Sequence, residues 1–248
     1  MKNDLTIISV VENDRGLINL MIDSVRKFTK PSPHFILCDN GHNGIILEKH
    51  RHDPLIKIVP HIPTLSGGSN RHGQSLNKIF PMVETGKTAI IESDCIVLSE
   101  KWHDLDLSKY KMASAIKNYN QGIMCYHMCF MLFGTNIMKH GDLIDFRPGK
   151  DSNRGNRNYK PWEDVGWGIQ KKIGEIQIKK LDFVDTKTGL GQYFGREFQS
   201  DELWFNNIPI VAHFGRGSNL AGKAIHKGFE SPERQLEMWK NKAKDIIG

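Results

Sequence analysis

No apolar run in this sequence approaches the roughly 18 residues that a membrane-spanning helix needs, so a transmembrane protein is not expected. Near the N-terminus, Asp4 interrupts the first residues, and a strand-like run follows at once, which argues against an export signal. The sequence has 4 cysteines, and none form a CxxC pair. We therefore expect a cytoplasmic protein whose thiols are reduced and structural.

Motifs of several common enzyme classes are also absent. No HExxH or GxSxG segment occurs, so metalloprotease and α/β-hydrolase chemistry have no local support. Gly68 and Gly73 have the spacing of a phosphate-binding loop, but Gln74 stands where that loop carries its lysine. The glycine pairs at 189/191 and 215/217 lack the third glycine of a dinucleotide site.

The charge balance is basic, with 34 Lys and Arg against 28 Asp and Glu, a net charge of +6 at pH 7. Such a balance favours an anionic partner: a nucleotide, a phospholipid surface or nucleic acid. Basic residues are spread along the whole chain without a nucleic-acid-binding motif, so nucleic acid is unlikely among the three.

The first hundred residues alternate between two patterns, β-branched apolar runs and segments with apolar residues at helical spacing. The expected strands are 5–11, 34–39, 56–59 and the run through 92–94; the expected helices are 17–28, 45–50 and 74–83. This alternation predicts a parallel sheet with right-handed crossovers. The acids Glu12, Asp39 and Asp94 at strand ends should then meet along one edge, where such sheets bind ligands.

The second half is less regular. We expect strands at 112–117, 124–133, 176–184 and from 209, a polar loop at 149–160, a helix from 161, and a last helix that Ser231 caps. The last helix carries an apolar stripe, which we expect to pack on the domain; contact with a membrane surface is the alternative.

Glu92-Ser93-Asp94 lies between two short apolar runs. On an extended chain, carboxylates at this spacing face the same side. Because hard divalent cations prefer carboxylate oxygens, the pair suits one ion bound against a phosphate-rich substrate. The alternative is a pair of exposed acids at a strand end, one of which caps a turn.

Several segments together resemble glycosyltransferases of the GT-A fold, most closely the large family 2 of mostly inverting enzymes. The matching segments are the opening strand 7–13, the "DDGS"-like turn 38–41, the "NxGxxxAxN"-like segment 70–77, the DxD motif in its ExD form at 92–94, and the "ED" acid pair after Trp162. Three departures are His42 in place of Ser, Glu92 in place of the first Asp, and Val-Gly-Trp after Asp164, which favours a single addition over polymerisation.

This resemblance implies an α/β chain with a Rossmann-like, mostly parallel central sheet flanked by helices, and a smaller mixed part on the acceptor side. We expect one GT-A domain over 1–248, with a nucleotide-sugar-binding half at 1–102, an acceptor-side half at 103–230 and a C-terminal helix at 231–248.

The resemblance also implies site residues. Asp94 would hold a divalent ion, with the late His213 completing its shell, and Asp164 would be the general base, with Glu163 as the fallback. Residues expected along the nucleotide sugar are Val11, Asn13, Asp39, Asn70, Arg71, His72, Asn77, Glu92 and Ser93. Simpler structural roles remain open: a turn-starting acid for Asp39, a helix-start acid for Asp164 and a core histidine for His213.

The implied activity is the transfer of one sugar, with inversion, from a nucleotide-diphospho-sugar to a hydroxyl of a glycan or glycolipid. The implied cofactor is Mn²⁺ or Mg²⁺, and UDP is the commonest donor nucleotide in the family. Two alternatives stay open. A sugar-phosphate nucleotidyltransferase would need a better Gly-rich basic loop than residues 12–16, and a non-catalytic nucleotide- or glycan-binding domain would not need the acids.

Overall fold

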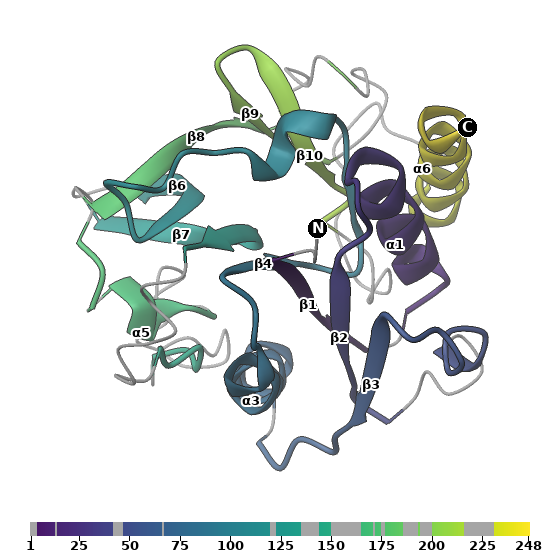
Figure 1. Cartoon of the computed structure of the whole chain (residues 1–248), viewed down its shortest axis with the longest axis horizontal. Coiled ribbons are helices and arrows are strands. Elements are labelled where there is room, and N and C mark those ends of the chain that lie inside the picture. The colour runs from purple at the N-terminus through teal and green to yellow at the C-terminus, as the bar shows by residue number, and fades with distance from the viewer. Residues whose placement is uncertain are drawn as a thin grey trace.

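The computed structural model describes residues 4–12, 14–41, 47–65, 67–119, 123–134, 144–149, 165–170, 172–174, 177–185, 193, 200–215 and 231–248. Within them, one sheet has the strand order β3-β2-β1-β4-β7-β6-β8-β9-β10-β5 (Figure 1). The strands are β1 (Leu5–Val11), β2 (His34–Asp39), β3 (Ile56–Pro60), β4 (Lys87–Ile91), β5 (Cys95–Val97), β6 (Met112–Tyr119), β7 (Ile123–Phe133), β8 (Ile178–Asp185), β9 (Asp201–Phe205) and β10 (Ile208–His213). The helices are α1 (Leu17–Phe28), α3 (Gly68–Ile79), α5 (Trp167–Gln170) and α6 (Pro232–Ile247), with short 3₁₀ turns η1 (Phe80–Met82) and η2 (Glu100–His103).

The parallel part of the sheet confirms the predicted alternation. β3, β2, β1 and β4 pair side by side in parallel, and β7 then joins β4 in the antiparallel sense. Every residue of β1 is buried, as expected for a strand covered on both faces. Successive side chains of β1 point to opposite faces of the sheet. Ile7 packs in the core with α1, whereas Ile8 packs in the core with α3.

The C-terminal helix α6 packs on the domain, as predicted from its apolar stripe. Ser231 caps it by accepting a hydrogen bond from the backbone N–H of Arg234 (3.3 Å). Trp239 is fully buried against Phe214, and α6 lies beside α1 (Figure 1). None of the described helices has the length and apolar character needed to cross a membrane.

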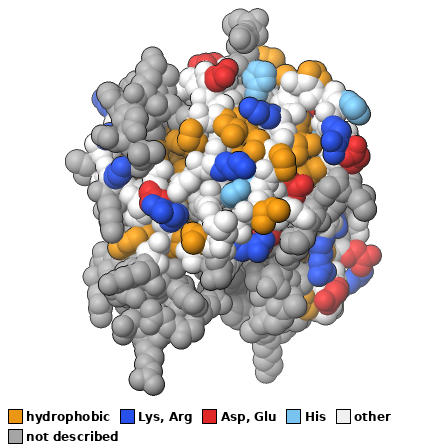
Figure 2. Space-filling view, turned by 90° about the horizontal axis from the view of Figure 1, so that it is seen from below, with side chains coloured by type: hydrophobic (Ala, Val, Ile, Leu, Met, Phe, Trp, Pro, Cys, Tyr) orange, Lys and Arg blue, Asp and Glu red, His pale blue; other side chains and the backbone are white. Residues whose placement is uncertain are grey.

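On the face shown in Figure 2, Lys and Arg side chains are scattered among acidic and hydrophobic ones and form no continuous basic stripe.

One expected helix differs from the structure, and one observed strand was not expected. The helix predicted at 74–83 begins earlier, at Gly68, and its α-helical part ends at Ile79, because Pro81 in the following turn has no backbone N–H to continue the hydrogen-bond pattern. Strand β9 was not predicted, because its sequence, Asp-Glu-Leu-Trp-Phe, begins with two acids that are nevertheless buried.

The segment 92–94 is also not a continuous strand, and this corrects the expectation of extended chain. β4 ends at Ile91, and a turn follows in which the backbone N–H of Cys95 donates to the carbonyl of Glu92 (3.0 Å). The chain then enters β5, which pairs with β10 at the far end of the strand order. The acids therefore lie on a turn between two strands.

Gly73 on α3 marks a close contact between this helix and residues 144–149. A Cβ atom at Gly73 would lie 2.5 Å from the backbone oxygen of Phe146. We expect Gly73→Ala to destabilise the fold by about 1–3 kcal/mol, because backbone atoms cannot move aside cheaply. Gly68→Ala is the matched control, since its Cβ would meet nothing within 4 Å, and it should be neutral or stabilising by up to about 1 kcal/mol. Urea unfolding of both variants measures the difference; equal stabilities would contradict the close contact.

Asp14 caps the start of α1, where its carboxylate accepts hydrogen bonds from the backbone N–H groups of Gly16 (2.7 Å) and Ile18 (3.1 Å). Burial raises the pKa of Asp14 from 3.8 to about 6, although these hydrogen bonds oppose the rise. Because the folded state holds this proton more tightly than the unfolded chain, the carboxyl favours folding at acidic pH. That contribution is lost as the pH rises through about 6.

The wild type should therefore lose stability relative to Asp14→Asn as the pH rises from about 4 to about 7. The difference in free energy of unfolding should shift by up to about 3 kcal/mol in favour of the variant. Denaturant unfolding across this range measures the difference. Asp23→Asn, at an exposed position of the same helix, is the control and should change little. If the difference in free energy of unfolding between Asp14→Asn and wild type stayed constant across this pH range, burial would not penalise the charged form of Asp14.

Candidate functional site

The carboxyl ends of β1 and β2 form the first part of the site. The backbone N–H of Asn40 donates to the carbonyl of Val11 (3.1 Å), which joins the two strand ends. Asp39 accepts a hydrogen bond from the backbone N–H of Gly41 (3.0 Å), and Gly41 has a φ of 91°. Asp39 therefore does start a turn, and its carboxylate lies at the strand end that the sequence predicts for nucleotide binding.

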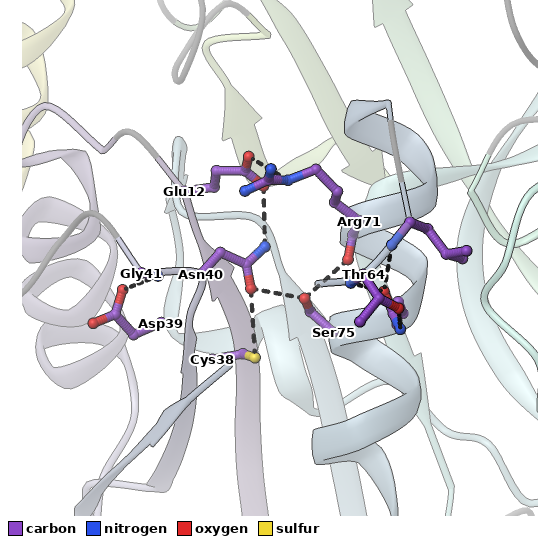
Figure 3. A network of polar contacts seen from close by, with 10 residues as sticks. Glu12, Cys38, Asp39, Asn40, Gly41, Thr64, Arg71 and Ser75 are labelled. Atoms are coloured by element: carbon purple, nitrogen blue, oxygen red, sulfur yellow. Dashed lines mark hydrogen bonds and ion pairs between the residues drawn. The ribbon is translucent and has the colours of Figure 1, made fainter. Parts of the chain in front are cut away.

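A polar network ties helix α3 to these strand ends (Figure 3). The amide of Asn40 donates to Glu12 (3.0 Å), and the hydroxyl of Ser75 donates to Asn40 (2.7 Å). Arg71 Nε lies 2.9 Å from Glu12 Oε1, so a half-buried ion pair crosses from α3 to the end of β1. These contacts fix the position of the Arg71 guanidinium at the sheet edge.

Gln74 is a residue of this region that sequence reasoning used only to reject a phosphate loop. Its side-chain oxygen accepts from the backbone N–H of Thr64 (2.9 Å), and its amide donates to the Thr64 hydroxyl (2.9 Å). Gln74 thus holds the loop after β3, in which Ile62 lies exposed beside Gly41.

The second part of the site joins the two acids of the 92–94 turn to the end of β10. His213 Nε2 lies 3.1 Å from Glu92 Oε2 and 3.4 Å from Asp94 Oδ1. The pairing of β5 with β10 sets this geometry, because His213 stands directly opposite Cys95, the residue after Asp94. The structure therefore brings Glu92, Asp94 and His213 together.

Charge pairing dominates the electrostatics of this group. Burial alone would lower the pKa of His213, but the negative charges of Asp94 and Cys129 and its contact with Asp201 raise it well above 6.5. Burial would raise the pKa of Glu92, but the hydrogen bond and charge of His213 lower it. An ion that binds here through His213 has to displace its proton.

Sequence reasoning missed three residues behind His213: His127 and Cys129 on β7, and Asp201 on β9. Asp201 Oδ2 lies 3.5 Å from both His127 Nε2 and His213 Nδ1. The alternation of His127 and Cys129 on one strand was the available signal, since residues two apart share a face. Burial opposes ionisation of Cys129, but a hydrogen bond from Cys95 and the charges of the two histidines lower its pKa to about 5.

The remaining predicted residues are placed as follows. Ser93 lies in the turn, and its side chain hydrogen-bonds Asp14. Asn70 and His72 lie on α3. The charge of His72 lowers the pKa of Glu92. Asn77 donates to Asp145 (2.8 Å) and accepts from the backbone N–H of Phe146 (2.9 Å), so it anchors residues 144–149. Asn13, Glu163 and Asp164 lie outside the described residues, as does most of the predicted loop at 149–160.

The donor atoms at this edge fit a divalent cation. Two carboxylates and one imidazole are ligands that Mn²⁺ accepts, and Mg²⁺ suits the carboxylates. The carboxylate of Asp201 stands behind His213 Nδ1, as an orienting carboxylate commonly stands behind a metal-binding histidine.

Three of the cysteines are described as free thiols. Cys38, Cys95 and Cys129 are free and buried. Burial raises the pKa of Cys38 to about 11, which keeps that thiol protonated and inert.

No protein-family model and no curated protein matches this sequence. Among solved structures, the Mn²⁺ and GDP-Man complex of the mannosyltransferase PcManGT from Pyrobaculum calidifontis is similar over 58% of this chain and 50% of its own, at 13% identity and a TM-score of 0.43. The inositol-1-phosphate CTP transferase from T. maritima aligns over 73% of this chain and 86% of its own, at 10% identity and a TM-score of 0.45. Similarities this low support no functional argument.

The similarity to the glycosyltransferase GlyE of Streptococcus pneumoniae TIGR4 extends over nearly the whole chain. The TM-score is 0.53 over 98% of this chain, at 10% identity, and the apo form gives the same TM-score and coverage at 13% identity. This chain spans 63% of the length of GlyE. At this level of identity the likeness shows the fold, and the chain therefore has the GT-A fold that its sequence predicts.

Proposed function

We propose that the protein is a metal-dependent glycosyltransferase that moves one sugar from a nucleotide-diphospho-sugar to a hydroxyl of a glycan or glycolipid acceptor. The observation that carries this proposal is the meeting of Glu92, Asp94 and His213 at the carboxyl edge of a GT-A sheet. Three convergent ligands beside the ends of parallel strands are what a cation-assisted diphosphate site requires.

In this proposal Asp94 and His213 hold Mn²⁺ or Mg²⁺, which when bound offsets the negative charge that builds on the departing diphosphate. Glu92 takes the ribose hydroxyls of the donor or contacts the ion through water. Arg71 and His72 face the diphosphate from α3, and the ion pair with Glu12 holds the Arg71 guanidinium in position.

The nucleotide base lies against the end of β2 in this proposal, where Asp39 accepts a hydrogen bond from its edge. Val11 and Asn13 at the end of β1, and Asn70 and Asn77 on α3, complete the nucleotide side of the site. UDP is the nucleotide to test first, because uridine is the commonest base in the family that the sequence resembles.

Asp164 is proposed as the general base that takes the proton of the acceptor hydroxyl as it attacks the anomeric carbon. Glu163 is the alternative base. A single displacement of this kind inverts the anomeric configuration, so the stereochemistry of the product is part of the proposal.

The donor site is tested by thermal unfolding with UDP, GDP, CDP or TDP, each with and without Mn²⁺. One nucleotide should raise the melting temperature by roughly 5–10 °C at a hundredfold excess over its dissociation constant, and only with metal. Asp94→Asn should lose this shift, whereas Asp182→Asn, at an exposed position of β8, should keep it. No shift with any of the four would reject the donor site, and a shift without metal would reject metal dependence.

The catalytic base is tested with Asp164→Asn. This variant should keep the metal-dependent thermal shift and lose about 10²–10⁴-fold in transfer rate, since general-base catalysis contributes that much. The measurement is release of nucleoside diphosphate from the donor in the presence of glycan acceptors, with Glu163→Gln as the matched variant. Near wild-type turnover of Asp164→Asn would reject the assignment.

The same assay tests the alternative enzyme class. If the wild-type protein released pyrophosphate and not a nucleoside diphosphate, it would be a nucleotidyltransferase.

A further inference from the structure

Behind the acids of the proposed donor site lies a second group of metal-binding side chains. His127, Cys129 and His213 each offer one ligand atom, and these three atoms lie within 4.8 Å of one another. All three residues are buried, at 7%, 0% and 8% exposure. They come from β7 and β10, two strands of the same sheet, so the backbone holds them in place.

The ligand types differ from those at the sheet edge. Two imidazoles and a thiol form a soft set, which zinc and chemically similar ions prefer, whereas manganese and magnesium prefer oxygen. Bond lengths of about 2.0–2.3 Å place ligands of a tetrahedral zinc ion about 3.3–3.7 Å apart, so side-chain rotations of about 1 Å would close this group around an ion.

Asp201 supports the same geometry. Its Oδ2 atom lies 3.5 Å from a ring nitrogen of each histidine, which is longer than a good hydrogen bond of about 2.7–3.2 Å. A buried carboxylate shared by two histidines is the kind of partner that orients imidazoles toward a metal. Because Asp201 faces His127 Nε2, the nitrogen that would bind the ion is Nδ1, which would give up the long contact from the backbone N–H of Cys129 (3.4 Å).

We propose that His127, Cys129 and His213 form a binding site for a soft divalent ion of the zinc class, distinct from the proposed hard-ion position at Asp94 and His213. The two positions share His213. Because a neutral imidazole binds one ion through one nitrogen, the soft ion and the donor ion compete for this residue. The soft site itself requires neither a donor nor turnover, so it stands or fails independently of the proposed function.

The test uses the metal-free full chain titrated with Co²⁺ alone, because Co²⁺ takes zinc positions and reports thiolate ligation by a charge-transfer absorption band. We expect a saturable band at one Co²⁺ per chain that Zn²⁺ abolishes. Cys129→Ser should lose the band. Cys38→Ser removes another buried thiol, outside the group, and should keep it. A wild-type protein without the band overturns the proposal.

Two further variants locate the ion. Cys95 belongs to an alternative group with Asp94 and His213, so Cys95→Ser should keep the band, and its loss there would overturn the assignment to Cys129. His127→Gln should weaken Co²⁺ binding at least tenfold while the band at saturation persists; unchanged affinity would remove His127 from the site. This variant also decides the case if Cys129→Ser fails to fold.

Asp94→Asn separates the two proposals. It should retain the cobalt–thiolate band while losing the metal-dependent shift with nucleoside diphosphate. Loss of the band in Asp94→Asn would place the ion at the sheet edge and overturn the second site. A band without any nucleotide shift in the wild type would support the second site and count against the proposed function alone.

Discussion

The pairing of β5 with β10 is the constraint on which the rest of the site depends. The chain leaves the parallel part of the sheet at Ile91, turns through Glu92 and Asp94, and reaches the opposite end of the strand order within a few residues. The register that sets Cys95 against His213 brings a histidine more than a hundred residues away in sequence onto the two acids. A shift of one residue would turn His213 to the other face of the sheet and separate the ligands.

The pairing of β5 with β10 also brings several charged side chains together in a partly buried region. Glu92, Asp94 and Asp201 gather around His213, and a buried carboxylate is costly unless a cation compensates it. The raised pKa of His213 is a consequence of this crowding, because protonation supplies a positive charge where the acids need one. Clusters of buried charged groups with shifted pKa values are typical of binding and catalytic sites.

Much of the fold could be predicted from local sequence patterns, because β-branched runs and helical spacing are local properties. The parallel strands, α1 and the capped helix α6 follow from such patterns. β9 could not be found, since its two buried acids contradict the apolar signal of a strand. Asp201 has its partners on β7 and β10, and Glu202 accepts from Tyr193 and Trp204. The turn at 92–94 was missed because apolar residues on both sides resemble one continuous strand.

Only those parts of the candidate site that lie in short local motifs could be predicted from the sequence. Glu92 and Asp94 form a short recognisable motif, and His213 entered through a family resemblance. His127 and Cys129 offered only their alternation on one strand, and its relevance depends on contacts between strands that are distant in sequence. The prediction of the proposed donor side was likewise incomplete. The ion pair between Arg71 and Glu12 links a helix to a strand end almost sixty residues earlier, and no local pattern indicates it.

The formal charges at this edge indicate why a cation would matter. Glu12 compensates Arg71, but three acids, Glu92, Asp94 and Asp201, lie beside His213, so even a protonated imidazole leaves a negative excess. A nucleoside diphosphate is itself an anion and would be repelled by that excess at short range. A divalent ion would offset that excess. The arrangement of charged side chains therefore supports the proposed metal dependence of donor binding, whichever sugar the donor carries.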